Sequence, residues 1–265
     1  MNLHPLPNLR IHRALGLVLP SLLTLAALPA GATTPAATAV SYQARAYCLE
    51  TGAELYSEHH RERWRGDRLV GASVEYRKPG GEVFATKHLS YEAGVITPSF
   101  EMEDHRSGYR EGAEVDGGEV LLFAQKPAKT VAEKERVELP ATAVIDAGFA
   151  YFVTRHWDRL AAGETVPLDF AVPARQRFVA FRALKTDGGA YQDRPALRVR
   201  MEPGNPVFRL LVDPIDLIFD RETRRLLVFE GLSNIEDDDG DSLDVRIVFD
   251  YSRAAPPDLA TALGR

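Results

Sequence analysis

Alternation of apolar and polar residues recurs through the second half of the chain and constrains its fold more than any other feature. Near the end, Leu243, Val245, Ile247, Phe249 and Tyr251 alternate with mostly charged residues. Segments 166–172 and 197–202 follow the same two-residue period. Because successive side chains of a strand point to opposite faces, each such segment places one face on a core and the other in water.

Glycine-containing turns divide the first half of the chain into short strand-like segments. The segments are 42–50, 55–64, 69–77 and 83–92, followed less regularly by 100–137. This spacing predicts consecutive antiparallel hairpins. Three later runs, 207–212, 215–219 and 226–232, are apolar at nearly every position, which predicts strands covered on both faces.

One segment at the middle of the chain has the period of a helix instead. Its apolar residues recur at spacings of three and four, as expected for an amphipathic helix over about residues 146–162. They are Ile145, Phe149, Phe152, Val153, Trp157 and Leu160. Asp146 is placed to cap the first turn, and Gly163 is placed to end the helix in a left-handed conformation.

A single helix limits how the sheet can be arranged. A helix of about sixteen residues is roughly 24 Å long, so it covers only a few strands of a flat sheet. We therefore expect a mainly β protein, with a strongly curved antiparallel sheet (a half-barrel or open barrel) wrapped around one central α-helix. The expected domain spans residues 41–252, and residues 253–265 are expected to form a tail.

The amino terminus has the pattern of a secretory signal peptide, residues 1–32. Arg10 and Arg13 precede an apolar run, residues 14–30, and Ala30-Gly31-Ala32 supplies small residues for cleavage. Residues 33–40 are expected to form a disordered lead-in. The pattern predicts an exported protein, periplasmic in a Gram-negative cell, with no membrane span after the signal is removed, because no later apolar run is long enough.

Composition and net charge argue against an internal disulfide and against nucleic-acid binding. The only cysteine, Cys48, leaves no internal disulfide, so stability must come from a hydrophobic core. Removing residues 1–32 deletes two arginines and no acids, which moves the net charge from −6 to −8. An acidic protein of this kind is a poor candidate for binding nucleic acid.

Four of these features together resemble bacterial periplasmic β-proteins of unknown function. They are the signal peptide, the series of hairpins, the segment IDAGFAYFVTRHWDRLAAGETVPLDF (145–170) and the hairpin LLVFEGLSNI (226–235). Some of those families share the outline of lipoprotein carriers, in which a half-barrel holds acyl chains beneath a helical lid. The resemblance covers the mature chain in outline and implies an apolar cavity. It carries no catalytic or ligand motif, so it transfers no functional residue.

Two groups of residues are candidates for ligand binding. Phe149, Phe152, Val153 and Trp157 could line an apolar groove, although a stripe at helical spacing more commonly forms core. Arg175 and Arg177 begin a basic segment that could bind an anionic head group. Alternatively, the arginines of this segment pair across strands with acidic neighbours.

The remaining sequence patterns do not predict a metal site or a catalytic site. The acidic segment EDDDGDSLD (236–244) fails the helix–loop–helix calcium template and reads more simply as a hairpin turn around Gly240. The histidines are scattered, and no nucleophile elbow or phosphate loop occurs. The sequence therefore predicts no catalytic residue, no metal and no cofactor.

We expect a protein that binds or carries an apolar, lipid-like ligand between sheet and helix, and the sequence favours a role without enzymatic activity. One alternative is an envelope protein with a solid core that binds another protein. A hydrolase or metal enzyme assembled from scattered histidines and acids is the other.

Overall fold

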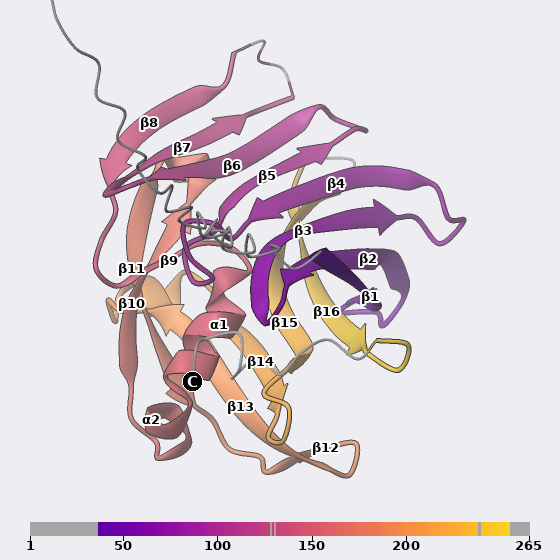
Figure 1. Cartoon of the computed structure of the whole chain (residues 1–265), viewed down its shortest axis with the longest axis vertical. Helices are drawn as coiled ribbons and strands as arrows, with labels where there is room; N and C mark the ends of the chain where they lie inside the picture. The colour runs from indigo at the N-terminus through magenta and orange to yellow at the C-terminus, as the bar shows by residue number, and fades with distance from the viewer. Residues whose placement is uncertain (1–36, 128, 130, 238–239, 255–265) are drawn as a thin grey trace, which may run out of the picture. The chain divides into compact units, whose positions relative to one another are not determined.

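The computed structural model describes residues 37–127, 129, 131–237 and 240–254 (Figure 1). These described residues form one compact unit. The expected signal peptide, most of the lead-in and residues 255–265 of the expected tail lie outside the described residues. Ala37–Val40, expected in the disordered lead-in, instead belong to the first strand.

Strands dominate the described residues, with two short α-helices and two 3-10 turns. The first group of strands is β1 (Ala37–Cys48), β2 (Glu54–Arg65), β3 (Arg68–Arg77), β4 (Val83–Ser90), β5 (Ser99–Asp104), β6 (Tyr109–Asp116), β7 (Glu119–Gln125), β8 (Glu133–Glu138) and β9 (Ala143–Val144). The helices α1 (Gly148–Arg155) and α2 (Trp157–Ala161) follow. The remaining elements are β10 (Val166–Val172), η1 (Pro173–Arg175), β11 (Arg177–Lys185), β12 (Ala190–Tyr191), β13 (Arg194–Pro203), η2 (Phe208–Leu210), β14 (Ile215–Asp220), β15 (Leu226–Glu236) and β16 (Ser242–Asp250).

The strands of the described part form one sheet in the order β8-β7-β6-β5-β4-β3-β2-β1-β16-β15-β14-β13-β11-β10-β9, with β12 paired to β13. Neighbouring strands are antiparallel except for β9, which runs parallel to β10. The last strand pairs with the first, so the two halves of the chain join at β1 and β16. The sheet curves around α1 and remains open, with β8 at one edge and β9 at the other (Figure 1). The expectation of a mainly β protein with a curved antiparallel sheet is confirmed.

The expectation of one central helix is not confirmed, because the helical segment is interrupted. His156, at φ −100° and ψ 18°, separates α1 from α2. The predicted end at Gly163 is confirmed: its φ is 90°. Gly163 N–H donates to Leu160 O, and Glu164 N–H donates to Arg159 O, both at 2.9 Å, which is the pattern of a Schellman motif.

The expected cap at Asp146 is wrong. Asp146 is in the left-handed region at φ 45°, and no side chain caps the first turn of α1. Its carboxylate instead forms an ion pair with Lys87 on β4, because the chain enters the interior there and brings the two side chains together.

One predicted strand is also absent. Residues 207–212, which are apolar at every position except Arg209, contain the η2 turn and are exposed rather than covered on both faces. The other two apolar runs form β14 and β15, as predicted. The acidic segment turns as predicted: Gly240, at φ 88°, donates its N–H to Asp237 O at 3.3 Å.

Gly148, the first residue of α1, lies against the loop between β4 and β5. A Cβ atom at Gly148 would lie 2.0 Å from the carbonyl oxygen of Ile96 and 2.6 Å from its carbonyl carbon. Ile145 N–H also donates to Ile96 O at 3.1 Å. The start of α1 therefore packs directly against the backbone at Ile96, and a side chain at position 148 would require that backbone to shift.

Replacing Gly148 by alanine should therefore destabilise the protein, although alanine favours helix by about 1 kcal/mol in an open position. We expect Gly148→Ala to lower the free energy of unfolding by about 2 kcal/mol through overpacking. Urea denaturation of residues 33–265 measures it. Gly118→Ala is the control, because nothing lies within 4 Å of its Cβ position. Equal stability of the two variants would contradict the close approach.

Candidate functional site

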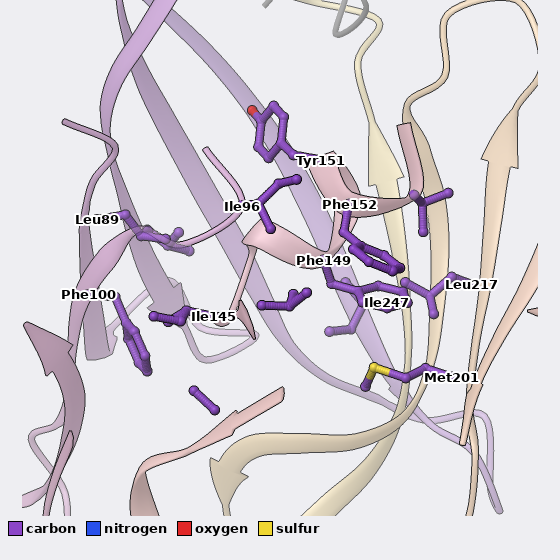
Figure 2. Close-up of a cluster of buried hydrophobic side chains, with 14 of the residues drawn as sticks. Leu89, Ile96, Phe100, Ile145, Phe149, Tyr151, Phe152, Met201, Leu217 and Ile247 are labelled. Atoms are coloured by element: carbon purple, nitrogen blue, oxygen red, sulfur yellow. The ribbon is translucent and has the colours of Figure 1, made fainter. Parts of the chain in front are cut away.

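The four helix residues expected to line an apolar groove are core residues. Phe149, Phe152, Val153 and Trp157 are all at most 6% exposed and belong to one hydrophobic cluster. Figure 2 shows Phe149 and Phe152 beside Leu217, Ile247 and Met201 of the surrounding strands. Side chains therefore fill the space on this side of α1, and a ligand could reach these four residues only if the helices moved.

The inner face of β10 and β11 is less completely covered. Leu168 pairs with Phe181, and Leu168 is buried in the core, so this row of β11 faces inward. Phe170, two residues beyond Leu168, contacts Phe181 with ring centroids 6.2 Å apart. Both phenylalanines are only half-buried although they pack against the core.

The same row of β11 ends in a cation. Along one face, Ala183 is buried, Phe181 and Val179 are half-buried, and Arg177 is exposed. The register has no irregularity here, and Arg177 pairs with Val172 at the end of β10. An apolar surface thus leads directly to a guanidinium group, which is the arrangement that an amphiphile with an anionic head requires.

Arg175 lies close by in sequence, in the exposed η1 turn between β10 and β11. Neither Arg175 nor Arg177 forms an ion pair with another described residue. Other arginines of the basic segment do pair across strands, as Arg182 does with Glu202 at 2.5 Å and Arg200 with Asp216 at 2.7 Å. The charge-pairing interpretation is therefore confirmed for those arginines.

The opposite half of the interior contains charged groups. Lys87 Nζ lies 2.8 Å from Asp146 Oδ1, and the two side chains are 10% and 13% exposed. Burial alone would lower the pKa of Lys87, but Asp146, Glu111 and Glu58 hold that pKa above its ordinary value. The second carboxylate oxygen of Asp146 is buried and has no hydrogen-bond partner among the described residues. Lys87 thus remains charged, and its ion pair connects Asp146, just before α1, to β4 of the sheet.

Two further carboxyl groups are buried nearby. Glu62 accepts hydrogen bonds from Trp64 Nε1 at 2.9 Å and from Tyr42 Oη at 3.1 Å. Glu111 accepts them from Tyr109 Oη at 3.0 Å and from Asn234 at 3.3 Å. Burial raises the pKa of both glutamates. These hydrogen bonds satisfy the buried carboxyl groups, and the interior is therefore partly polar.

Sequence reasoning missed this polar network, although alternation offered a signal. Lys87 lies between Ala85 and Leu89 at an inward position of β4. Glu58 and Glu62 likewise lie between Tyr56 and Trp64 on the buried face of β2. A charged residue in an apolar row marks a buried charge, but its partner comes from a distant segment that the sequence does not identify.

Two of the surface hollows in the described part of the chain are lined by residues other than the four helix residues. One, of about 90 Å³, lies on β5–β8 and is lined by Glu101, Arg110, Glu114, Phe123, Gln125, Ala132 and Lys134. The other, of about 270 Å³, is lined by Arg194, Asp220, Thr223, Arg225, Leu227, Tyr251 and Ala254. Among the described residues, no cluster of three or more His, Cys, Asp or Glu side chains is placed to hold a metal ion.

Comparison with known proteins gives a structural similarity without a matching family. No family model matches the chain, and no curated protein matches it. The chain is similar to a crystal structure described as a β-barrel-like protein of a domain of unknown function, DUF1849, from Brucella abortus. The identity is 10%, the match covers 80% of this chain and 94% of that chain, and the TM-score is 0.37. Within the described residues, none of the helices has the length and apolar character to cross a membrane.

The Lys87–Asp146 pair should be essential for stability, because removing one partner leaves a buried charge. We expect Lys87→Met to lower the free energy of unfolding by about 3–5 kcal/mol. Adding Asp146→Asn should recover part of the loss, since asparagine tolerates the left-handed conformation without a charge. Urea denaturation monitored by near-ultraviolet circular dichroism measures both effects.

Lys78→Met is the matched control for this prediction. Lys78 pairs with Glu82, but the two side chains are 45% and 70% exposed. Exposed pairs contribute at most about 1 kcal/mol. If Lys87→Met costs no more than Lys78→Met, the buried pair does not hold the helix start in place.

Proposed function

We propose that the protein is exported and binds a lipid-like ligand, an apolar chain with an anionic head, between the curved sheet and the helices. The observation that carries this proposal is the inward row of β11, in which half-buried Phe181 and Val179 lead to exposed Arg177. Half-buried apolar side chains next to a free cation suit an acyl chain and its head group. The proposal involves binding without covalent chemistry.

In this proposal the ligand enters at the start of β11, which is the end away from α2. α2 contacts β11, and Lys185 Nζ at the far end of the strand donates to Ala161 O at 3.3 Å. The acyl chain would lie on Phe170 and Phe181, while Arg177 and Arg175 contact the head. Contact with Phe149, Phe152, Val153 and Trp157 follows only when the helices shift. The interruption at His156 favours such a shift, because each short helix depends on packing rather than on its own length.

A second candidate is an envelope protein that binds a protein partner at its surface. The observation in its favour is the complete burial of the α1 stripe, with Val153 at 0% exposure. A core filled in this way does not need a ligand. This candidate requires no movement of the helices, so a ligand-binding measurement separates the two.

A fluorescent amphiphile, dansylaminoundecanoic acid, tests the ligand proposal. We expect saturable binding to residues 33–265, weakened at least about tenfold by Phe181→Asp, since a buried charge opposes contact with an apolar chain. Arg177→Gln should weaken binding about fivefold by removing one head-group charge. Enhanced dansyl fluorescence measures binding directly.

Ala180→Asp is the control, because Ala180 is the exposed neighbour of Phe181 on the opposite face of β11. Circular dichroism checks that each variant is folded, and Arg177→Gln tests the site at an exposed position if Phe181→Asp does not fold. Absence of saturable binding, or equal weakening by Ala180→Asp, would favour the partner-binding candidate.

Export has its own test. When the full chain is expressed in a Gram-negative host, we expect mature protein in the periplasmic fraction with an amino terminus close to residue 33, because a signal peptidase cleaves after small residues such as Ala32. Intact-mass measurement of the fractionated protein determines the cleavage point. Recovery of uncleaved chain from the cytoplasm would refute the export proposal.

A further inference from the structure

The connection between β13 and β14 exposes an unusual number of apolar side chains. We define the 207–212 loop as Val207, Phe208, Arg209, Leu210, Leu211 and Val212. Leu210 is 85% exposed, Leu211 75% and Val207 63%, and Phe208 and Val212 are also exposed. Exposing several large apolar side chains side by side opposes folding, so such patches usually mark a surface that contacts a protein or a membrane.

The loop has a defined conformation that turns its one charged residue toward the sheet. Arg209 Nη1 donates to Glu202 Oε1 on β13 at 3.1 Å, and Glu202 also pairs with Arg182. Within the loop, Val212 N–H donates to Phe208 O at 3.0 Å. Asn205 Oδ1 accepts from Val207 N–H at 2.8 Å. The tip therefore presents apolar groups outward without a cation among them.

Exposed cations lie at the same end of the sheet. Phe181 pairs with Pro203, and Gly204 N–H donates to Ala180 O at 3.0 Å, so the start of β11 runs beside the loop. Arg177 is three residues from Ala180, about 10 Å along the strand. Arg175 precedes it in η1. Asp213, which follows the loop, is exposed, so these segments carry two exposed arginines and one exposed acid.

Apolar side chains flanked by exposed arginines match the chemistry of one particular partner. We propose that the 207–212 loop docks on an anionic lipid surface. The apolar side chains enter the boundary between head groups and acyl chains, which accepts apolar groups to a depth of about 5–10 Å. Arg175 and Arg177 contact lipid phosphates, which attract basic residues near the surface. The apolar side chains of the 207–212 loop are separate from Phe181 and Val179 of β11, whereas Arg175 and Arg177 are shared with the proposed ligand site.

Vesicle sedimentation tests the proposal with residues 33–265, which lack the apolar amino-terminal segment. We expect binding to phosphatidylcholine vesicles containing about 30% phosphatidylglycerol and much weaker binding to phosphatidylcholine alone. Phe208→Ser combined with Leu211→Ser should lower the partition coefficient at least about tenfold. Arg175→Gln combined with Arg177→Gln should remove most of the preference for phosphatidylglycerol.

Matched controls change similar side chains elsewhere. Val131→Ser alters an apolar side chain that is 73% exposed between β7 and β8, and Arg194→Gln removes an exposed arginine at the other end of β13. Neither should affect vesicle binding. A Phe208→Trp variant adds a direct readout, because lipids brominated in the acyl chain should quench its fluorescence, while Trp64 and Trp157 are buried.

The outcomes distinguish docking from ligand binding. Phe181→Asp should retain vesicle binding and lose the dansyl amphiphile, whereas the loop variants should do the reverse. The docking proposal is overturned if the unaltered chain binds neither vesicle, or if Val131→Ser weakens binding as much as the loop variants. It is also overturned if the loop variants instead abolish association of the chain with itself in light scattering.

Discussion

The inner face of the sheet is the constraint on which the rest of the structure depends. Most strands present an apolar face, and the sheet curves so that these faces point toward a common interior. The helical segment formed by α1 and α2 and the loop around Ile96 supply most of the core side chains that the strands do not provide themselves. α1 is therefore apolar on nearly all sides: Gly148, Phe149, Tyr151, Phe152, Val153 and Thr154 are all buried. A helix on the outside of a sheet would need only one apolar stripe.

Curvature also explains why charged groups occur inside. A concave sheet brings distant strands close together, and Lys87 and Asp146, which are 59 residues apart, meet across the interior. Such a pair adds little net stability compared with apolar packing, but it is costly to break. It thus fixes where the chain leaves the sheet and enters the interior. The interior is divided between this polar half and the apolar rows of β10 and β11, where a ligand is proposed.

Much of the fold could be predicted from the sequence because local patterns carry it. Alternation placed β10, β13 and β16, glycine turns separated β1 to β4, and Gly163 ended the helical segment as expected. The predictions were wrong where the same residue types occur in two different structural environments. Residues 207–212 have the composition of a buried strand, but their position between Pro203 and Pro214 leaves them outside the sheet. Aspartate is a common helix-capping residue, but the carboxylate of Asp146 pairs with Lys87 instead.

The candidate site was less accessible to prediction than the fold. Arg175 and Arg177 were identified by charge, and the structure adds that Arg177 continues the inward row containing Phe181. That row depends on the register between β10 and β11, which composition does not determine. The spacing of the aromatic stripe favours core over groove, and burial in three dimensions decides between them. Its residues are at most 6% exposed, which places them in the core.

An open sheet leaves two unsatisfied edges, and the strand at one of them has an informative sequence. β8 reads Glu-Lys-Glu-Arg-Val-Glu and is exposed along most of its length. Charged side chains on an edge strand disfavour the addition of a strand from another molecule. The other edge, β9, is only two residues long and offers little template for pairing. The curved sheet can consequently remain unclosed while neither edge strand favours pairing with a strand of another molecule.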